Sequence, residues 1–477
     1  MEQNLKQHTK SGLYWKFLDL FSGYGIQFIL GIIMARLLSP RDYGIAALPA
    51  LFFAIADIVQ NGGLHAALVR KQVVSERDLS TSFYYSFLVG VSSYAILFVS
   101  SPWIAAFFNT PILTSLIRVS AISFLWCPLS TPQLVLLDRK LDFKTQTKTG
   151  VFCKLFSGVI GITIAFMGYG VWALVISELS RTFFRTAFFF ILVKWHPKSG
   201  FSKESFKYLW GFGNKMMLSS LIDAVYVNIT TVFIGKFFSP AKLGVYNRSQ
   251  GYASMPSKHV TSVIQGVTYP ILSKINNDDD ERLAADYRRI LKVSAFVIFP
   301  VMMLLSALAR PLIITMITAK WEECILLLQI MCFSMLWYPI NVLNLTLLQV
   351  KGRSDLFLRL EIIKKIVGVS VLAITLPMGL IAICIGEVVC SVFFLVISTH
   401  YNGRLISFGF LKQIKELLPT FALSLFMFFT VRLFLLAFDN MWVQVFGGGV
   451  IGIAIYWILA VMFKFSETDD VKYLLRK

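Results

Sequence analysis

The feature that most constrains the fold of this chain is a series of fourteen apolar segments between residues 17 and 463. A segment of about 20 apolar residues is long enough to cross the roughly 30 Å hydrocarbon core of a bilayer as a helix. The segments lack the apolar–polar alternation of transmembrane β-strands, so their backbone hydrogen bonds must be satisfied within helices. The predicted spans are residues 17–38, 43–64, 79–101, 112–136, 147–168, 170–193, 206–236, 245–272, 289–309, 322–349, 357–378, 380–399, 414–437 and 441–463.

The composition agrees with a membrane protein. Hydrophobic residues make up 56% of the chain and charged residues only 15%, whereas a soluble domain carries about 25% charged residues. A net charge of +19 would suggest a nucleic-acid partner for a soluble protein. Here the cations lie mostly in short connections between apolar runs, where they set membrane orientation instead, so we predict no nucleic-acid partner. The first run is too long for the apolar core of a signal peptide, and we expect it to be retained.

Lysine and arginine are distributed unequally between alternate connections. With the N-terminus placed inside, the cytoplasmic connections and the span ends next to them hold 31 of the 45 cations, the outer connections with their adjoining span ends hold six, and eight lie deeper within spans. Cytoplasmic connections are enriched in Lys and Arg, and a miscounted span would reverse the bias after the error. Because no reversal occurs, the sequence predicts an even number of spans with both termini in the cytoplasm.

The chain also contains an internal repeat. The segment Ala35–Gly44, which reads ARLLSPRDYG, recurs as Gly235–Gly244, which reads GKFFSPAKLG. Pro and Gly end one helix and permit a tight return, so each copy is suited to a short outer hairpin. Six spans separate the copies, which predicts an all-α membrane fold of two six-helix bundles related by a pseudo-two-fold axis along the membrane normal. We expect one bundle over residues 1–200, the other over 201–400, and two further helices with a cytoplasmic tail over 401–477.

Sequence signatures of enzymes are missing. The chain has no phosphate-binding GxxxxGK[ST] loop, no HExxH, no GxSxG and no dinucleotide-binding fingerprint. Its six cysteines show no metal-ligand spacing. The acidic run at 278–281 is interpreted as a solvated inner loop rather than as a metal motif of a glycosyltransferase. We therefore predict no catalytic residues, no metal site, no cofactor and no enzymatic activity.

Ionisable residues at membrane depth are the candidates for function. Such residues are costly where they face lipid, so they line an internal cavity, form ion pairs between helices, or extend to the membrane surface. Glu178, Arg181 and Arg185 share one helical face at spacings of three and four residues, and one ion pair there would leave one cation without a carboxylate. Cations outnumber acids within the spans, which favours an anionic passenger. The candidate substrate-binding cations are Arg181, Arg185, Lys215, Arg248 and Lys258.

Acids at the same depth are candidates for energy coupling. A carboxylate that changes its surroundings between two conformations can bind and release H⁺ or Na⁺. Asp57 and Asp223 each lie near the middle of a span, and Lys215 shares a helical face with Asp223. Glu178 is a third candidate, although the two arginines on its face favour its ionised form. The alternative is that these acids only accept hydrogen bonds between helices.

The motifs at the two copies of the repeat carry a family resemblance. The polar N-terminus leads into Ser11–Lys16 (SGLYWK), the first span ends in ARLLSPRDYG, and the second copy continues as VYNRSQ. The chain resembles polysaccharide transporter family flippases of the colanic-acid and O-antigen exporter type, within the multidrug/oligosaccharidyl-lipid/polysaccharide exporter superfamily. The resemblance implies translocation of undecaprenyl-diphosphate-linked oligosaccharides across the bacterial inner membrane, by alternating access and with coupling to an ion gradient. It also implies contacts with membrane lipids and with polysaccharide polymerase machinery.

Two other classes of function remain open from the sequence. A multidrug or metabolite antiporter would share the fold, and dependence on a lipid-linked sugar would separate the two. A membrane-embedded polysaccharide polymerase would be an enzyme and would be expected to carry a long outer loop with catalytic arginines. All the predicted outer connections are short, which disfavours the polymerase.

Overall fold

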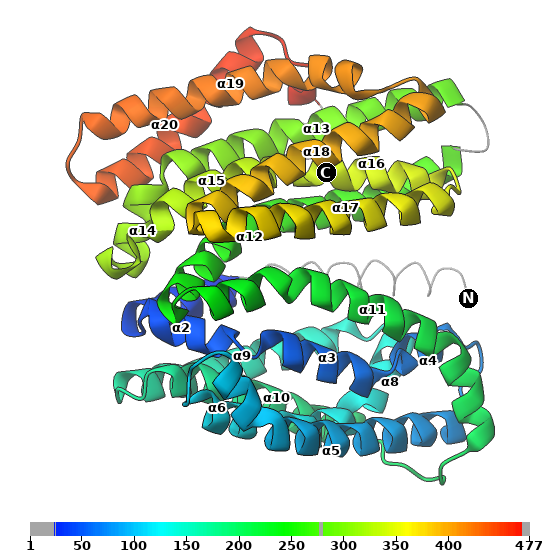
Figure 1. Ribbon diagram of the computed structural model, residues 1–477. Helices are drawn as coiled ribbons and strands as arrows, with labels where there is room; N and C mark the ends of the chain where they lie inside the picture. The colour runs from blue at the N-terminus through cyan, green and yellow to red at the C-terminus, as the bar shows by residue number, and fades with distance from the viewer. Residues whose placement is uncertain (1–22, 24, 276–279, 470–477) are drawn as a thin grey trace. The chain divides into compact units, whose positions relative to one another are not determined.

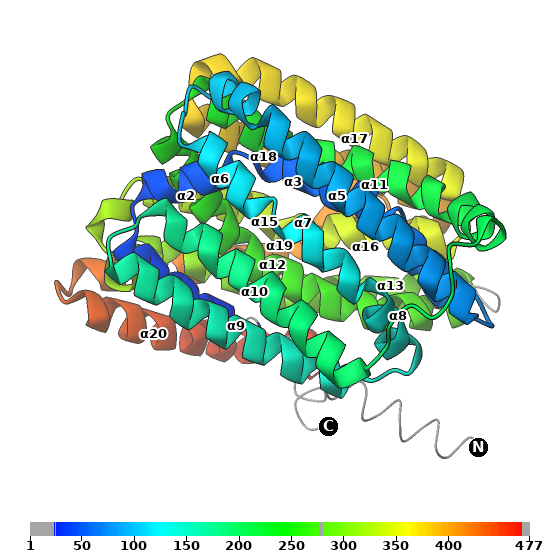
Figure 2. The ribbon, with the colours of Figure 1, turned by 90° about the horizontal axis from the view of Figure 1, so that it is seen from below.

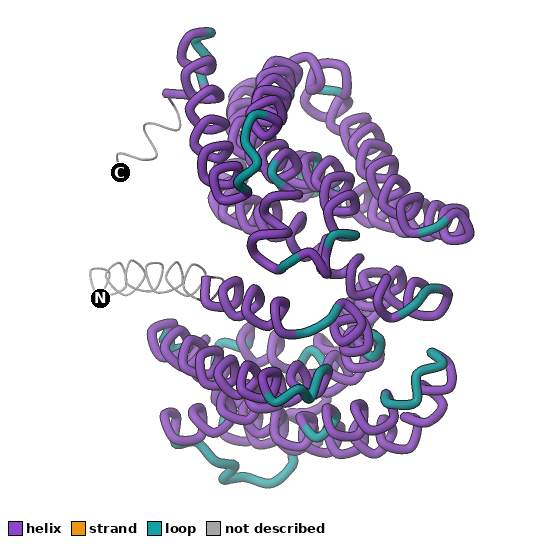
Figure 3. The backbone as a smooth tube through the Cα atoms, turned by 90° about the vertical axis from the view of Figure 1, so that its left-hand side faces the viewer, coloured by secondary structure: helices purple, strands orange, loops and turns teal. Residues whose placement is uncertain are grey.

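A computed structural model describes residues 23, 25–275 and 280–469 of this chain. Within these ranges the backbone consists of helices and loops without a strand (Figure 3). The predicted all-α class is therefore confirmed. The described residues do not include positions 278 and 279 of the acidic run or the two chain ends. They also leave out most of the part of the first predicted span that precedes residue 25.

The helices match the predicted spans along the described chain. Ten helical segments are long and apolar enough to cross a membrane. The remaining predicted spans coincide with the shorter helix Gly25–Leu37 and with three helices that are more polar or more highly charged, α10 (Val171–Val193), α12 (Pro240–Ile275) and α17 (Ser354–Thr375). The protein is therefore a multi-pass membrane protein.

Contacts divide the chain into two compact units, residues 1–244 and 245–477. The predicted bundle boundaries at residues 200 and 400 are placed from the sequence repeat, whereas these units are defined by contacts. The predicted boundaries therefore stay a prediction. The first unit contains the helix Gly25–Leu37, α2 (Pro40–Ala47), α3 (Ala50–Asn61), α4 (Leu64–Arg70), α5 (Glu76–Phe107), α6 (Leu113–Ser120), α7 (Ser123–Trp126), η1 (Cys127–Ser130), α8 (Thr131–Arg139), α9 (Phe143–Phe166), α10 and α11 (Lys203–Phe237).

Two predicted spans of the first unit are broken into shorter helices. The span predicted at 43–64 is divided at Pro49 and again at Gly62 and Gly63, whose φ angles of 54° and 68° glycine adopts at the lowest cost. The span predicted at 112–136 is divided into α6, α7, η1 and α8, and prolines stand at the starts of η1 and α8, at Pro128 and Pro132. Apolar composition located these spans, whereas the local breaks follow from single residues.

Helix α11 belongs to the first unit by its packing. Its Gly213 lies against the turn after α3, where a Cβ at Gly63 would be 2.2 Å from the Gly213 carbonyl oxygen. The connection from α10 is fastened to α5, because the Trp195 indole donates to the Glu76 carboxylate at 3.2 Å and Ser202 N donates to Thr81 Oγ1 at 3.0 Å. Helices α9 and α10 lie side by side (Figures 1 and 2), with the rings of Phe156 and Phe184 5.9 Å apart.

The second unit is built around α13, which packs against α15, α16 and α19. Its Phe299 is fully buried and lies 5.5 Å from the ring of Trp337 and 6.1 Å from that of Phe421. The unit contains most of α12, and α13 (Asp280–Ala307), α14 (Ala309–Ile317), η2 (Ala319–Trp321), α15 (Cys324–Leu336), α16 (Tyr338–Val350), α17, η3 (Leu376–Met378), α18 (Leu380–Ile406), α19 (Phe410–Leu436) and α20 (Met441–Met462).

Candidate functional site

The charged face predicted on α10 forms within the first unit. Arg181 donates two hydrogen bonds to the carboxylate of Glu178, one turn earlier, and the bond from Nε to Oε2 is 2.8 Å long. Such a two-point contact aligns the guanidinium plane with the carboxylate and fixes its direction. The predicted ion pair is therefore present, and it occupies Glu178.

Arg185 lies one turn further along the same face. Its Nε is buried, and no residue in the described part of the chain accepts a hydrogen bond from it. Asp57, on α3 of the same unit, lies near enough to Arg185 for their opposite charges to attract each other. The sequence predicted one cation on this face without a carboxylate, and the fold brings the opposite charge of Asp57 near Arg185 without an ion pair between them among the described residues. The α10 cluster therefore consists of Asp57, Glu178, Arg181 and Arg185.

This arrangement gives the first unit a charged site at the depth of the bilayer. The α10 cluster holds two arginines and two carboxylates, and the net positive charge that the excess of cations over acids across all the spans suggests for the substrate cavity stays a prediction. Arg185 nevertheless keeps a buried donor that its described neighbours do not use. A guanidinium in this state is suited to bind an oxyanion such as a phosphate.

The remaining candidates lie on two long helices. Lys215 and Asp223 are exposed on α11 in the first unit. Arg248 and Lys258 lie on α12 in the second unit, ten residues apart, which is about 15 Å along a helix. The Arg248 guanidinium lies over the rings of Tyr252, at 5.2 Å, and Trp321, at 5.7 Å. Their roles in substrate binding and coupling stay predictions.

Two charged residues that the sequence analysis did not select also lie at membrane depth. In the first unit, a Cβ at Gly23 would be 2.6 Å from Lys154 Nζ, so this cation on α9 points at the first helix. In the second unit, Tyr246 donates a short hydrogen bond to the carboxylate of Glu387 on α18. A single charged residue in an apolar run marks such sites in a sequence, but it does not reveal the partner.

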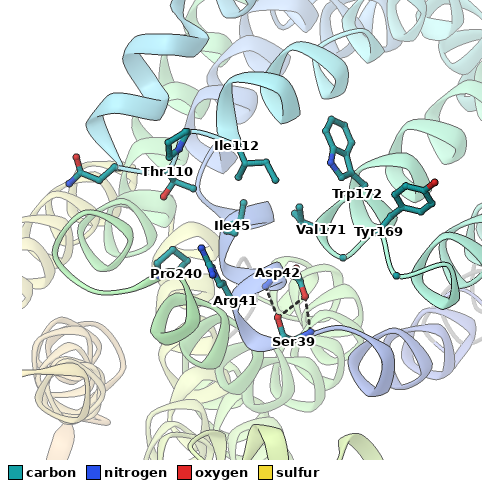
Figure 4. A pocket seen from close by; sticks show the side chains of 14 residues that line it. Ser39, Arg41, Asp42, Ile45, Thr110, Ile112, Tyr169, Val171, Trp172 and Pro240 are labelled. Atoms are coloured by element: carbon teal, nitrogen blue, oxygen red, sulfur yellow. Dashed lines mark hydrogen bonds between the residues drawn. The ribbon is translucent and has the colours of Figure 1, made fainter.

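A pocket of about 590 Å³ opens at one end of the first unit (Figure 4). The cation pattern of the sequence predicts that this end of the helices faces the periplasm. Trp172 and Tyr169 lie on one side of the pocket, and Thr110 and Pro240 lie on the opposite side. The charged residues that line it are Arg41 and Asp42, both from the first copy of the repeat. The sequence analysis missed this pocket because its walls come from four separate connections.

The carboxylate of Asp42 is oriented by its own helix. Asp42 Oδ2 accepts hydrogen bonds from Ser39 N at 2.9 Å and from Ser39 Oγ at 2.6 Å, which forms a capping box at the start of α2. The second oxygen, Oδ1, lies toward Gly170, where a Cβ would approach it to 2.9 Å. Local turn chemistry thus holds one carboxylate oxygen in a fixed direction.

Comparisons with known proteins are consistent across sequence and fold. The model of the polysaccharide biosynthesis protein family matches residues 33–326. The teichuronic acid biosynthesis protein TuaB of Bacillus subtilis is 26% identical, over 74% of this chain and 73% of its own. The succinoglycan biosynthesis transport protein ExoT of Rhizobium meliloti is 24% identical, over 67% of this chain and 64% of its own. The lipid II flippase MurJ in its inward closed conformation has the same fold, with a TM-score of 0.72 at 17% identity, over 94% of this chain and 98% of MurJ.

Proposed function

Because this chain belongs to the polysaccharide biosynthesis protein family, we propose that it is a flippase for lipid-linked oligosaccharides. It moves undecaprenyl-diphosphate-linked repeat units across the bacterial inner membrane, for the synthesis of capsule, exopolysaccharide or O-antigen. A curated relative is named as a transport protein of succinoglycan biosynthesis, which supports transport rather than sugar-transfer chemistry. The protein acts as a transporter and not as an enzyme.

The observation that carries this proposal is the buried, unused donor of Arg185 within the α10 cluster. A lipid-linked sugar presents a diphosphate between an apolar tail and a polar glycan, so the diphosphate must find donors at membrane depth. Arginine binds phosphate oxygens through a planar fork of N–H groups. Arg181 is held by Glu178, which leaves Arg185 as the principal phosphate ligand of the first unit. Lys215, Arg248 and Lys258 supply further positive charge.

The proposal includes orientation and energy coupling. The cation asymmetry supports cytoplasmic termini, and the absence of a nucleotide-binding motif in the sequence supports coupling to a gradient of H⁺ or Na⁺. Asp57 and Asp223 are the carboxylates that bind and release the coupling ion, and Glu178 is a third candidate for this role. Polysaccharide polymerase machinery and membrane lipids are the expected partners.

The test is export of polysaccharide by a deletion strain that carries each variant. Arg185→Gln removes the unused donor, and a phosphate contact of about 1.5–3 kcal/mol corresponds to a roughly 10- to 150-fold loss of transport. Lys194→Gln, at the end of the same helix, is the matched control and should export normally. Export is read together with membrane abundance of the protein and with accumulation of lipid-linked repeat units.

Two outcomes would contradict the proposal. Normal export by the deletion strain would show that the chain is not the flippase of this pathway, and new drug sensitivity in that strain would favour the antiporter alternative. Normal export by a double variant with Arg185→Gln and Lys258→Ala would show that these two cations are not needed to bind the diphosphate.

A further inference from the structure

We propose that the pocket at the outer end of the first unit binds a sugar residue of the translocated oligosaccharide. The proposal rests on the flippase function above and assigns a glycan site separate from the diphosphate ligands. The ligand is a neutral pyranose ring, which is recognised through its C–H face and its hydroxyls. This outer sugar pocket is lined by Arg41, Asp42, Thr110, Tyr169, Trp172 and other residues of the outer connections.

The size and charge of the outer sugar pocket fit a neutral polar ligand. A volume of about 590 Å³ lies in the range of small-molecule sites, which run from roughly 300 to 1,000 Å³. One cation and one anion, Arg41 and Asp42, are the charged groups of the lining. A balanced pair of this kind offers both donors and acceptors to the hydroxyl groups of a neutral ligand.

The hydrogen-bonding groups are oriented before any ligand arrives. Asp42 Oδ2 is held by Ser39, while no described residue donates a hydrogen bond to Oδ1. A carboxylate accepts about four hydrogen bonds, so Oδ1 keeps its capacity for ligand hydroxyls. An acceptor that is already held in place loses little conformational entropy when a ligand binds, which favours recognition of a specific hydroxyl.

The aromatic groups supply the apolar half of the site. Tyr169 is 61% exposed, and the backbone N–H of Trp172 donates to the Tyr169 carbonyl at 3.2 Å, which closes the turn that presents both rings. Gly168 and Gly170 flank Tyr169 with φ angles of 82° and 52°, a conformation that glycine adopts at low cost. Aromatic rings offer large rigid apolar faces next to polar edges, which suits the C–H face of a pyranose.

The competing interpretation is that the rings anchor the protein at the membrane surface, where Trp and Tyr are frequent. Trp103 provides the comparison. It lies near the outer end of α5, is 69% exposed, and is not part of the pocket lining. An anchoring role would make Trp103 and Trp172 equivalent, whereas a glycan role would make only Trp172 important for sugar binding.

The experiment measures binding of a free oligosaccharide to the full-length protein in detergent by saturation-transfer NMR. The probe is the repeat-unit oligosaccharide released by mild acid from the polysaccharide that the host exports, which lacks the lipid and the diphosphate. We expect the unmodified protein to bind the probe and Trp172→Ala to bind it about three- to tenfold more weakly. Trp172→Phe and Trp103→Ala should bind it like the unmodified protein. Arg185→Gln should also bind the probe normally, because the probe has no phosphate.

The outcomes separate this inference from the function on which it rests. If the deletion strain fails to export polysaccharide but the purified protein shows no oligosaccharide binding, the flippase function stands and the outer sugar pocket is refuted. Equal binding by Trp172→Ala and the unmodified protein also refutes it. A variant that elutes from size exclusion like the unmodified protein is folded. Normal sugar binding by Trp172→Phe would show that any aromatic ring at this position supports binding.

Discussion

Gly44 and Gly244, which occupy equivalent positions in the two copies of the repeat, pack against each other's helix start. A Cβ at Gly44 would lie 1.6 Å from the Pro240 carbonyl oxygen, and a Cβ at Gly244 would lie 1.9 Å from the Pro40 carbonyl oxygen. Both separations are far below any contact that a real Cβ makes. The repeat is therefore more than a pair of similar turns, because its two copies form one reciprocal contact in which only glycine fits.

We predict that Gly44→Ala and Gly244→Ala each destabilise the protein strongly. A methyl group at either position must displace the opposite backbone, and overpacking of this kind costs about 1–3 kcal/mol or more. The apparent Tm in detergent, measured by loss of the monodisperse peak after heating, should fall by several degrees for each variant.

Gly251→Ala is the matched control for this substitution. Gly251 lies on α12 and a Cβ there meets no atom within 4 Å, so the exchange should leave the Tm unchanged or raise it slightly. If Gly44→Ala and Gly251→Ala give the same Tm, the close approach of the two glycines does not stabilise the protein.

Membrane orientation is predicted from the cation asymmetry and can be measured directly. A cysteine at Asp439, in the exposed connection before α20, should react with an impermeant maleimide added to intact cells. A cysteine at Lys140, in the exposed connection before α9, should react only after the membrane is permeabilised. The native cysteines form a low background, since five are buried and Cys127 is partly buried.

The decisive residues for this topology lie in the connections at 138–146 and 274–288. Labelling of either connection from outside would place an odd number of spans before it. The two-bundle arrangement with both ends in the cytoplasm would then be wrong, whatever the outcome at Asp439.

Energy coupling is predicted to depend on Asp57 and Asp223. Asp57 interacts with the charge of Arg185 and lies on the helix that packs against α11, the helix of Asp223. In proteoliposomes, flipping of a fluorescent lipid-linked oligosaccharide should respond to an imposed H⁺ or Na⁺ gradient. Asp57→Asn or Asp223→Asn should abolish this response while substrate binding persists, because a neutral amide takes up no proton near neutral pH and has no charge to attract Na⁺.

Asp439→Asn, in an exposed connection, is the control and should keep the full response. Gradient-dependent flipping by both Asp57→Asn and Asp223→Asn would show that neither carboxylate couples transport to the ion gradient. Loss of flipping in every condition would instead indicate that the α10 cluster needs Asp57 to position Arg185.

Much of the fold follows from the sequence because the bilayer imposes a simple rule. Each span must be apolar and helical to avoid unsatisfied backbone groups, so the fourteen segments could be placed without knowing any contact. Even the spans interrupted by polar residues, 206–236 and 245–272, coincide with the long helices α11 and α12. The face shared by Glu178, Arg181 and Arg185 also followed, because helical periodicity is local information.

Only the tertiary structure decided which residues from different spans meet. Asp57 reaches the α10 cluster from another helix, Glu387 meets Tyr246, and the outer sugar pocket joins four connections. These pairings depend on how helices pack, and packing is set by side-chain shape and small-residue contacts rather than by hydropathy. The two copies of the repeat could be recognised from their letters, but their reciprocal contact at Gly44 and Gly244 required the folded chain, because two hundred residues separate them.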